Sequence, residues 1–271
     1  MKKITSRINH TRIENGYCFI CKSYGKLTKD HVPPKGSVII TKREQKSISE
    51  CLGEQYKEIN GLKIQRASVF KTICYRCNSE ILGKLDNHFC NVIKMLSDKV
   101  NDHFITKSNI YNSVHIPFNS HEFTRAMVGH VLSATSITSC MKPIIDNDFF
   151  TPLRKFVLGE ISTYENTHDI YYWFYPHATH ISAQGIAFYN EGNICICSLL
   201  YFFPIAFLIT LKGQGTYPTQ ANKLEIKDKM LFLDLSTFNI NYSSFPFIDL
   251  KDNQMMMFND GFTCISYPIN Y

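Results

Sequence analysis

Four of the ten cysteines in this chain have the spacing of metal ligands. Cys18 and Cys21 form one C-x-x-C pair, and Cys74 and Cys77 form a second. A C-x-x-C turn places two sulfurs on one side of the backbone, and two such turns can surround zinc as a tetrahedron. Because four sulfurs saturate a zinc ion, the sequence predicts a structural Zn²⁺ site and not a catalytic one.

A histidine between the two pairs is suited to acid–base chemistry. Hydrolysis of a phosphodiester bond needs a base that takes a proton from water and a cation on the departing oxygen. His31 can accept a proton near neutral pH. Its neighbour Asp30 would point to the opposite side of a strand, so the two side chains cannot have the same role.

Three segments carry a family resemblance: Cys18-Phe-Ile-Cys21, Thr28-Lys29-Asp30-His31-Val32-Pro33-Pro34-Lys35 and Cys74-Tyr-Arg-Cys77-Asn78. They resemble the zinc-knuckle branch of the HNH endonuclease family, which has a ββα-metal fold. The resemblance covers about residues 15–100. It implies that Asp30 and Asn78 bind a catalytic Mg²⁺ or Mn²⁺ ion and that His31 is the general base, since hard oxygen ligands suit such an ion.

The chain departs from the family pattern in two places. The family usually has an asparagine a few residues before the last cysteine pair, but residues 67–71 read Ala-Ser-Val-Phe-Lys. In addition, 52 residues separate Cys21 from Cys74, more than a compact version requires. The alternative function is therefore a non-catalytic zinc module that binds nucleic acid or protein and retains a degenerate site.

Charge is distributed unevenly along the chain. Residues 1–110 contain 20 Lys/Arg and 10 Asp/Glu, whereas residues 111–271 contain 9 and 13. A basic N-terminal part indicates a polyanionic partner, and we expect nucleic acid, with DNA favoured over RNA. The residues expected to contact phosphates are Lys29, Lys35, Lys71 and Arg76, with Arg43 as a further candidate.

Other histidines and cysteines give weaker signals. His88 is an alternative metal ligand on the helix that Asn78 would begin, but ten residues of helix span about 15 Å, too far for both to bind one ion. His177 and His180 fit either a second metal site or a polar loop. Cys195 and Cys197 alternate with isoleucines, a pattern typical of strand packing.

Local patterns predict the elements that position these residues. Residues 17–31 indicate a knuckle followed by a strand, and the highly charged residues 42–60 a helix or an excursion. An extended stretch over 62–73 leads to the second knuckle. Apolar residues at helical spacing predict a helix from Asn78 to about residue 100.

A second group of elements follows a linker expected at residues 105–120. Ser120 could cap a helix that runs to about residue 133, and Asp148 one that Gly159 ends. Residues 170–271 read as strands, with a hairpin turn at 190–193.

The uncharged stretch from Ile194 to Leu211 is 18 residues long. Pro204 lies near its middle, and β-branched and aromatic residues dominate it. These features favour two buried strands over a membrane span. We therefore expect no membrane association.

Composition sets the overall expectation. With 271 residues, 44% of them hydrophobic, the chain is long enough for one large domain or two modest ones. We expect an α+β protein with an HNH-like nuclease domain at 1–110 and a helix-then-β-rich domain at 111–271. That second domain would bind a protein partner, a small ligand or another copy of itself.

The cellular setting follows from the cysteines and the N-terminus. Basic residues near the start are not followed by an apolar run, so we expect no secretory signal and a reducing, cytoplasmic location. The expected function is a metal-dependent endonuclease in genome defence or a mobile element.

Overall fold

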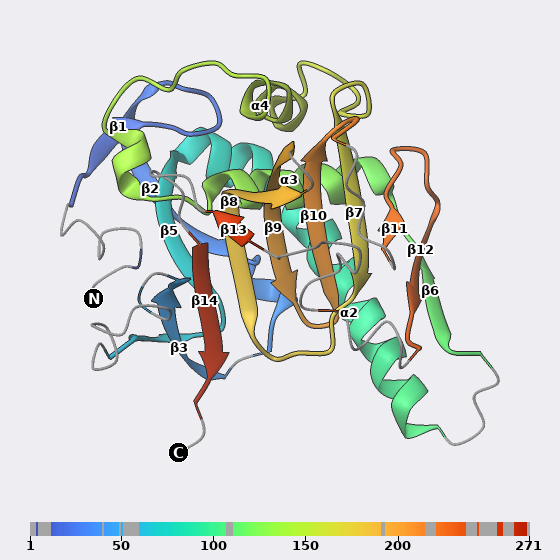
Figure 1. Cartoon of the computed structure of the whole chain (residues 1–271). Helices are drawn as coiled ribbons and strands as arrows, with labels where there is room; N and C mark the ends of the chain where they lie inside the picture. Colours follow the sequence, from blue (N-terminus) through green and yellow to red (C-terminus); the bar gives the residue numbers. More distant parts are fainter. Residues whose placement is uncertain are drawn as a thin grey trace.

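The computed structural model describes residues 12–39, 41–48, 60–106, 111–190, 193–214, 221–236, 254–256 and 263–269, together with Ile4, Glu50 and Ser243. Within these residues the chain has the expected mixed α+β architecture (Figure 1). The strands are β1 (Asn15–Tyr17), β2 (Tyr24–Val32), β3 (Lys42–Ser47), β4 (Leu62–Gln65), β5 (Ser68–Cys74), β6 (Ser113–Pro117), β7 (His168–Phe174), β8 (His180–Asn190), β9 (Asn193–Phe202), β10 (Ile205–Leu211), β11 (Asn222–Lys223), β12 (Met230–Asp234), β13 (Gln254–Met256) and β14 (Thr263–Pro268). The helical segments are η2 (Lys35–Ser37), η4 (Arg76–Leu82), α2 (Gly83–Ile105), α3 (Ser120–Ser133), η5 (Ile137–Cys140) and α4 (Phe150–Leu158).

A small antiparallel sheet, in the order β1-β2-β5, carries the sequence motifs. The chain leaves β5 at Cys74 and turns directly into the π-helical segment η4 and then α2. The helix predicted from Asn78 to about residue 100 is confirmed, and it extends to Ile105. Its apolar stripe is buried because it faces the core; the stripe consists of Leu85, Phe89, Val92, Ile93, Leu96 and Val100.

The charged segment 42–60 begins with strand β3; its residues 49 and 51–59, where the sequence predicts a helix or an excursion, lie outside the described part. β3 and β4 do not belong to the small sheet. They pair with each other at one edge of a large sheet, where β3 also pairs with β14. Alternate side chains of β3 are buried, and Arg43 is among them. Its guanidinium donates to Ser266 Oγ (2.8 Å), Ser266 O (2.6 Å) and Ala178 O (2.5 Å). Arg43 is therefore a buried sheet contact and not a phosphate contact.

The large sheet has the strand order β11-β7-β10-β9-β8-β14-β3-β4 within the described residues, and β13 also pairs with β8. β8 and β9 form the expected hairpin, whose residues 191–192 lie outside the described part. β9 and β10 are antiparallel neighbours on the two sides of Pro204, so the prediction of two buried strands is confirmed. In the part of the chain that the structure describes, no helix is long and apolar enough to cross a membrane.

Helices α2 and α3 pack on one face of this sheet (Figure 1). The Phe89 ring lies 6.2 Å from that of Phe202, and the Phe123 ring 5.7 Å from that of Phe207. The opposite face buries a second set of aromatic residues that includes Trp173 and Tyr201. Because both faces are covered, β7 is buried along its whole length and shows no alternation of polar and apolar residues.

The two later helices lie where the sequence predicts them, but neither Ser120 nor Asp148 is the N-cap. Asn119, not Ser120, accepts from the backbone N–H of Glu122 (3.4 Å) at the start of α3. Asn147, not Asp148, accepts from the backbone N–H of Phe150 (2.6 Å) at the start of α4. Gly159 ends α4 with φ at +79°, as expected for a glycine at this position.

The change of charge near residue 110 does not mark a boundary between two cores. One hydrophobic cluster includes described residues from both sides of residue 110, and β3 and β4 extend the sheet built from the later strands. Thr72 Oγ1 donates to Ser133 O (2.5 Å), and the Cys140 thiol to Thr72 O (3.4 Å). Part of the expected linker is strand β6, which pairs with β12. The different roles assigned to 1–110 and 111–271 stay a prediction.

Candidate functional site

The four motif cysteines come together as the sequence predicts. Cys18, Cys21, Cys74 and Cys77 each direct a sulfur into one cluster, and all four sulfurs lie within 4.8 Å of one another. The Sγ atoms of Cys21 and Cys74 are 3.6 Å apart. A zinc ion with Zn–S bonds of about 2.3 Å holds its sulfurs about 3.8 Å apart, so the cluster could hold a structural metal such as zinc.

Backbone geometry forms the first knuckle. The N–H of Lys22 donates to Cys18 O (2.8 Å), and the N–H of Cys18 donates to Ser23 O (2.9 Å). Lys22 adopts φ of +61°, which lets the chain turn back directly after the pair. The N–H of Cys74 then donates to Cys18 Sγ (3.3 Å), so β5 delivers the second pair directly to the first.

The four sulfurs share protons unequally. Hydrogen bonds to the other cysteines raise the pKa of Cys18, whereas the contact with Cys18 lowers the pKa of Cys21 and lowers that of Cys74 to about 6. Some thiols of the cluster therefore lose their protons more easily than others. A cation among the sulfurs would stabilise the deprotonated form of all four.

Asn78 is fixed against the end of β2. Its amide Nδ2 donates to Thr28 Oγ1 (3.0 Å) and to Lys29 O (2.8 Å), and Thr28 Oγ1 in turn donates to Ile73 O (3.0 Å). Because Asn78 follows Cys77, the cysteine cluster and this network together join the start of the helical segment to β2 and β5. The Asn78 side chain is thereby held beside the residues that precede Asp30 and His31.

His31 is half-buried on β2 opposite Val69. Burial lowers its pKa; the Asp30 carboxylate counteracts this, and the positive charges of Lys35, His130 and Lys29 lower it further. The imidazole is therefore neutral at pH 7, which is the protonation state that a general base needs.

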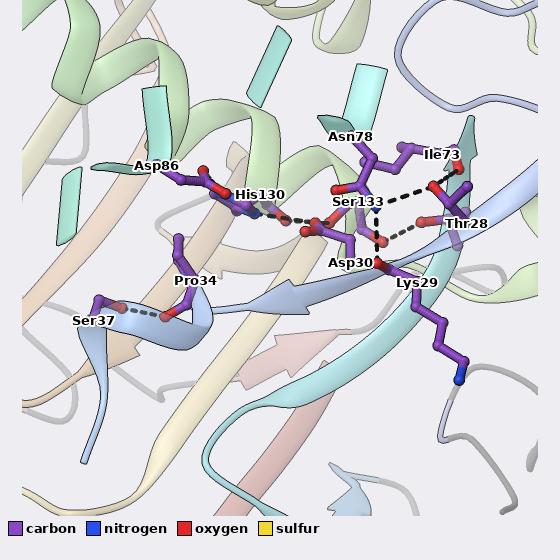
Figure 2. A network of polar contacts seen from close by, with 11 residues as sticks. Thr28, Lys29, Asp30, Pro34, Ser37, Ile73, Asn78, Asp86, His130 and Ser133 are labelled. Atoms are coloured by element: carbon purple, nitrogen blue, oxygen red, sulfur yellow. Dashed lines mark hydrogen bonds and ion pairs between the residues drawn. The ribbon is translucent and has the colours of Figure 1, made fainter. Parts of the chain in front are cut away.

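Asp30 is buried and makes ionic and hydrogen-bond contacts that the sequence did not predict (Figure 2). Its Oδ2 accepts from Ser133 Oγ and lies 3.1 Å from His130 Nδ1. The other ring nitrogen of His130, Nε2, lies 2.9 Å from Asp86 Oδ1. We call Asp30, Asp86, His130 and Ser133 the buried polar cluster. Within the described residues, the hydrogen bonds of the Asp30 carboxylate are made by Oδ2 and not by Oδ1.

One member of the buried polar cluster, His130, is positively charged. Burial opposes the charged form of His130, but Asp30 and Asp86 outweigh it and raise the pKa of His130 to about 10. His130 is an imidazolium at pH 7 that donates one N–H to each carboxylate. It ties α3 to β2 and to α2. The weak sequence signal is that His130 and Ser133 are polar residues in an otherwise apolar run, Ala-Met-Val-Gly-His-Val-Leu-Ser at 126–133.

The four residues expected to contact phosphates divide into two kinds. Lys29, Lys35 and Arg76 are exposed. Lys71 is half-buried and donates to Ile13 O (3.2 Å). Lys29 and Lys35 both act electrostatically on His31. These two lysines therefore lie near the candidate base, whereas Lys71 supports the loop before β1.

The remaining histidines do not form metal sites in the described part of the chain. His88 lies 3.3 Å from the backbone of Asn119, at the start of α3. His177 hydrogen-bonds Ser243 Oγ (3.0 Å), whereas His180 is buried, and burial lowers its pKa to about 3. Among the described residues, the four motif cysteines are the only group of three or more His, Cys, Asp or Glu side chains close enough together to hold a metal. Cys195 and Cys197 are buried in the sheet, as expected.

Comparisons with protein families, with curated proteins and with solved structures found no match to this chain. The resemblance to the HNH endonucleases therefore depends on the motif residues alone.

Proposed function

We propose that the chain is a metal-dependent endonuclease that hydrolyses phosphodiester bonds of nucleic acid, DNA in preference to RNA. The observation that carries this proposal is the pair of amide contacts from Asn78 to Thr28 and Lys29. These contacts bring the residue after the last cysteine to the strand that presents Asp30 and His31. The cysteine cluster would hold zinc and keep this junction rigid.

In this proposal each residue has one role. His31, neutral at pH 7, removes a proton from the attacking water. The Oδ1 atoms of Asp30 and Asn78 would hold a Mg²⁺ or Mn²⁺ ion, which stabilises charge on the departing oxygen when bound. The exposed Lys29 and Lys35 attract the phosphate backbone, and their contribution decreases with salt.

The test is cleavage of plasmid DNA, and of RNA, by the whole protein with Mg²⁺ or Mn²⁺ and then with a chelator. His31→Ala should slow cleavage by about 10²–10⁴-fold and leave DNA binding unchanged, because a general base lowers the activation barrier and does not contribute to DNA affinity. His115→Ala, which removes an exposed histidine from β6, is the matched control. Equal rates for both variants would exclude His31 as the base.

The pH profile gives a second measure of the same role. Because the pKa of His31 is below its ordinary value of 6.5, kcat/KM should be constant near pH 7 and decrease on the acid side as His31 gains a proton. If the residual kcat/KM of His31→Ala still decreases at the same acidic pH, the group that gains the proton is not His31.

A second candidate is a non-catalytic zinc module that binds nucleic acid. The observation that favours it is the engagement of Asp30 Oδ2 by Ser133 and His130, which leaves one carboxylate oxygen for a cation. If DNA is bound without cleavage under every divalent metal tested, and Lys29→Ala weakens that binding, this candidate replaces the first.

A further inference from the structure

A cavity of about 530 Å³ lies beside the first cysteine knuckle. Its wall is formed by Phe19 in the knuckle, by residues of the segment 138–147, by Phe150 and Arg154 of α4, and by two residues of β8. This volume is in the range of sites that enclose a small molecule. None of the residues in the wall belongs to the proposed catalytic site.

A β-bulge shapes the floor of the cavity. On β8, Ala183 pairs with Leu199 and Ile186 pairs with Cys197, so Gln184 and Gly185 stand opposite a single residue of β9. These two extra residues line the cavity. The Gln184 amide is fixed because its Nε2 donates to Leu132 O (2.6 Å). Bulges often turn the chain toward a functional site.

Arg154 is a buried cation with unpaired donors. Only 3% of the residue is exposed, and its Nη2 donates to Ile145 O (3.3 Å). Its Nε and Nη1 are buried and have no hydrogen-bond partner within the described residues. The guanidinium carbon lies 5.3 Å from the centre of the Phe19 ring. Unpaired buried donors are costly, and since Arg154 lines the cavity, its guanidinium is placed to pair with an anion there.

The charges around the cavity also favour an anion. Lys142 is exposed and lines the cavity, and no acidic residue is among the lining residues. Asp146 is the carboxylate whose charge acts on Arg154. Its own oxygens, however, pair with Lys22 Nζ (2.7 Å) and accept from Thr151 Oγ1 (2.9 Å). It therefore does not replace a ligand anion at Arg154.

We propose that this cavity binds a small anion with an apolar body, whose carboxylate or phosphate group pairs with Arg154. A guanidinium pairs strongly with either group. The apolar body would contact the hydrophobic part of the wall, which comprises Phe19, Met141, Pro143, Ile144, Ile145 and Phe150. This site is independent of the proposed nuclease activity, because it needs neither His31 nor a divalent cation.

The first experiment compares three ligands with the same apolar body on the full chain: octanoate, octyl phosphate and octanol, titrated by ligand-observed NMR. At least one of the two anions should bind about tenfold or more tightly than octanol, which cannot pair with the guanidinium. The ranking of octanoate against octyl phosphate identifies the preferred head group. Equal binding of octanol, or no binding of any of the three, would overturn the proposal.

The second experiment uses Arg154→Met, with Lys155→Met as the matched control, because Lys155 is an exposed cation on the same helix. Arg154→Met should lose the preference for anions, and its Tm without ligand should be equal to or above that of the native protein, because an unpaired buried charge is removed. Lys155→Met should keep the preference. If Arg154→Met does not fold, the ligand series on the native chain still tests whether the cavity prefers anions. If it folds and keeps the preference, the proposal is wrong.

Discussion

The cysteine cluster and the buried polar cluster both connect the small sheet to a helical segment, but they do so by different means. The cysteine cluster uses four residues of the N-terminal part, in two pairs of fixed spacing. The buried polar cluster joins Asp30 to His130, one hundred positions later in the chain. The first can be recognised from local spacing and needs a metal to be complete. The second pairs ionised side chains from three different elements, so it depends on the whole fold.

The largest effect is expected from breaking the cysteine cluster. Cys74→Ser should lower the metal content from about one equivalent of zinc per chain and reduce Tm or solubility, because structural zinc contributes strongly to folding. Cys90→Ser is the control, since Cys90 is half-buried outside the cluster. Freshly purified native protein without zinc would exclude the zinc assignment, whatever the variants show.

Breaking the buried polar cluster should have the next largest effect. His130→Ala leaves Asp30 without its cation, and removal of one partner from a buried ion pair costs about 3–5 kcal/mol. Urea unfolding at pH 7 measures this loss. His115→Ala, on the exposed side of β6, should change stability by less than about 0.5 kcal/mol. Similar small losses in both variants would show that the cluster contributes little.

The pH dependence of stability should separate the two clusters further. The pKa of His130 is raised from 6.5 to about 10 in the folded protein, so its contribution is complete below pH 6.5. It decreases as pH rises toward 10, by at most about 1.4 kcal/mol per pH unit. The stability difference between native protein and His130→Ala should therefore be smaller at pH 9 than at pH 7. A constant difference would mean that His130 is not charged in the fold.

A smaller effect is expected at Asn78, which follows Cys77 and hydrogen-bonds the residues directly before Asp30. Asn78→Ala removes two hydrogen bonds and should cost about 1–3 kcal/mol of stability, together with most metal-dependent cleavage. His88→Ala, which removes a contact with the backbone of Asn119, should reduce cleavage mildly. The opposite ranking, at saturating Mg²⁺ and with zinc content unchanged, would exclude Asn78 as the cation ligand.

Asn78→Asp distinguishes the two roles of this residue. The aspartate keeps an oxygen for a cation but cannot donate to Lys29 O. If Asn78 acts mainly as a ligand, the variant keeps cleavage, and its stability falls. If it acts mainly by holding β2, cleavage is lost at every Mg²⁺ concentration.

Local sequence patterns determined much of this protein. The spacing of the cysteines predicted their cluster, apolar periodicity predicted α2, and capping residues predicted α3 and α4. Pro204 with its uncharged flanks predicted β9 and β10. These features depend on neighbours within a few residues, where steric preference and hydrophobic spacing are sufficient. The residue types at positions 30, 31 and 78 likewise indicated where to look for chemistry.

Only the tertiary structure decided how those residues are used. The sequence predicted Asp30 as a cation ligand, and only the fold shows that Ser133 and His130 engage one of its carboxylate oxygens from α3. It suggested that Arg43 contacts phosphate, whereas β3 pairs with β14 and buries it. A buried charge must find its partner wherever the packed chain places one, and no local pattern records a partner one hundred residues away.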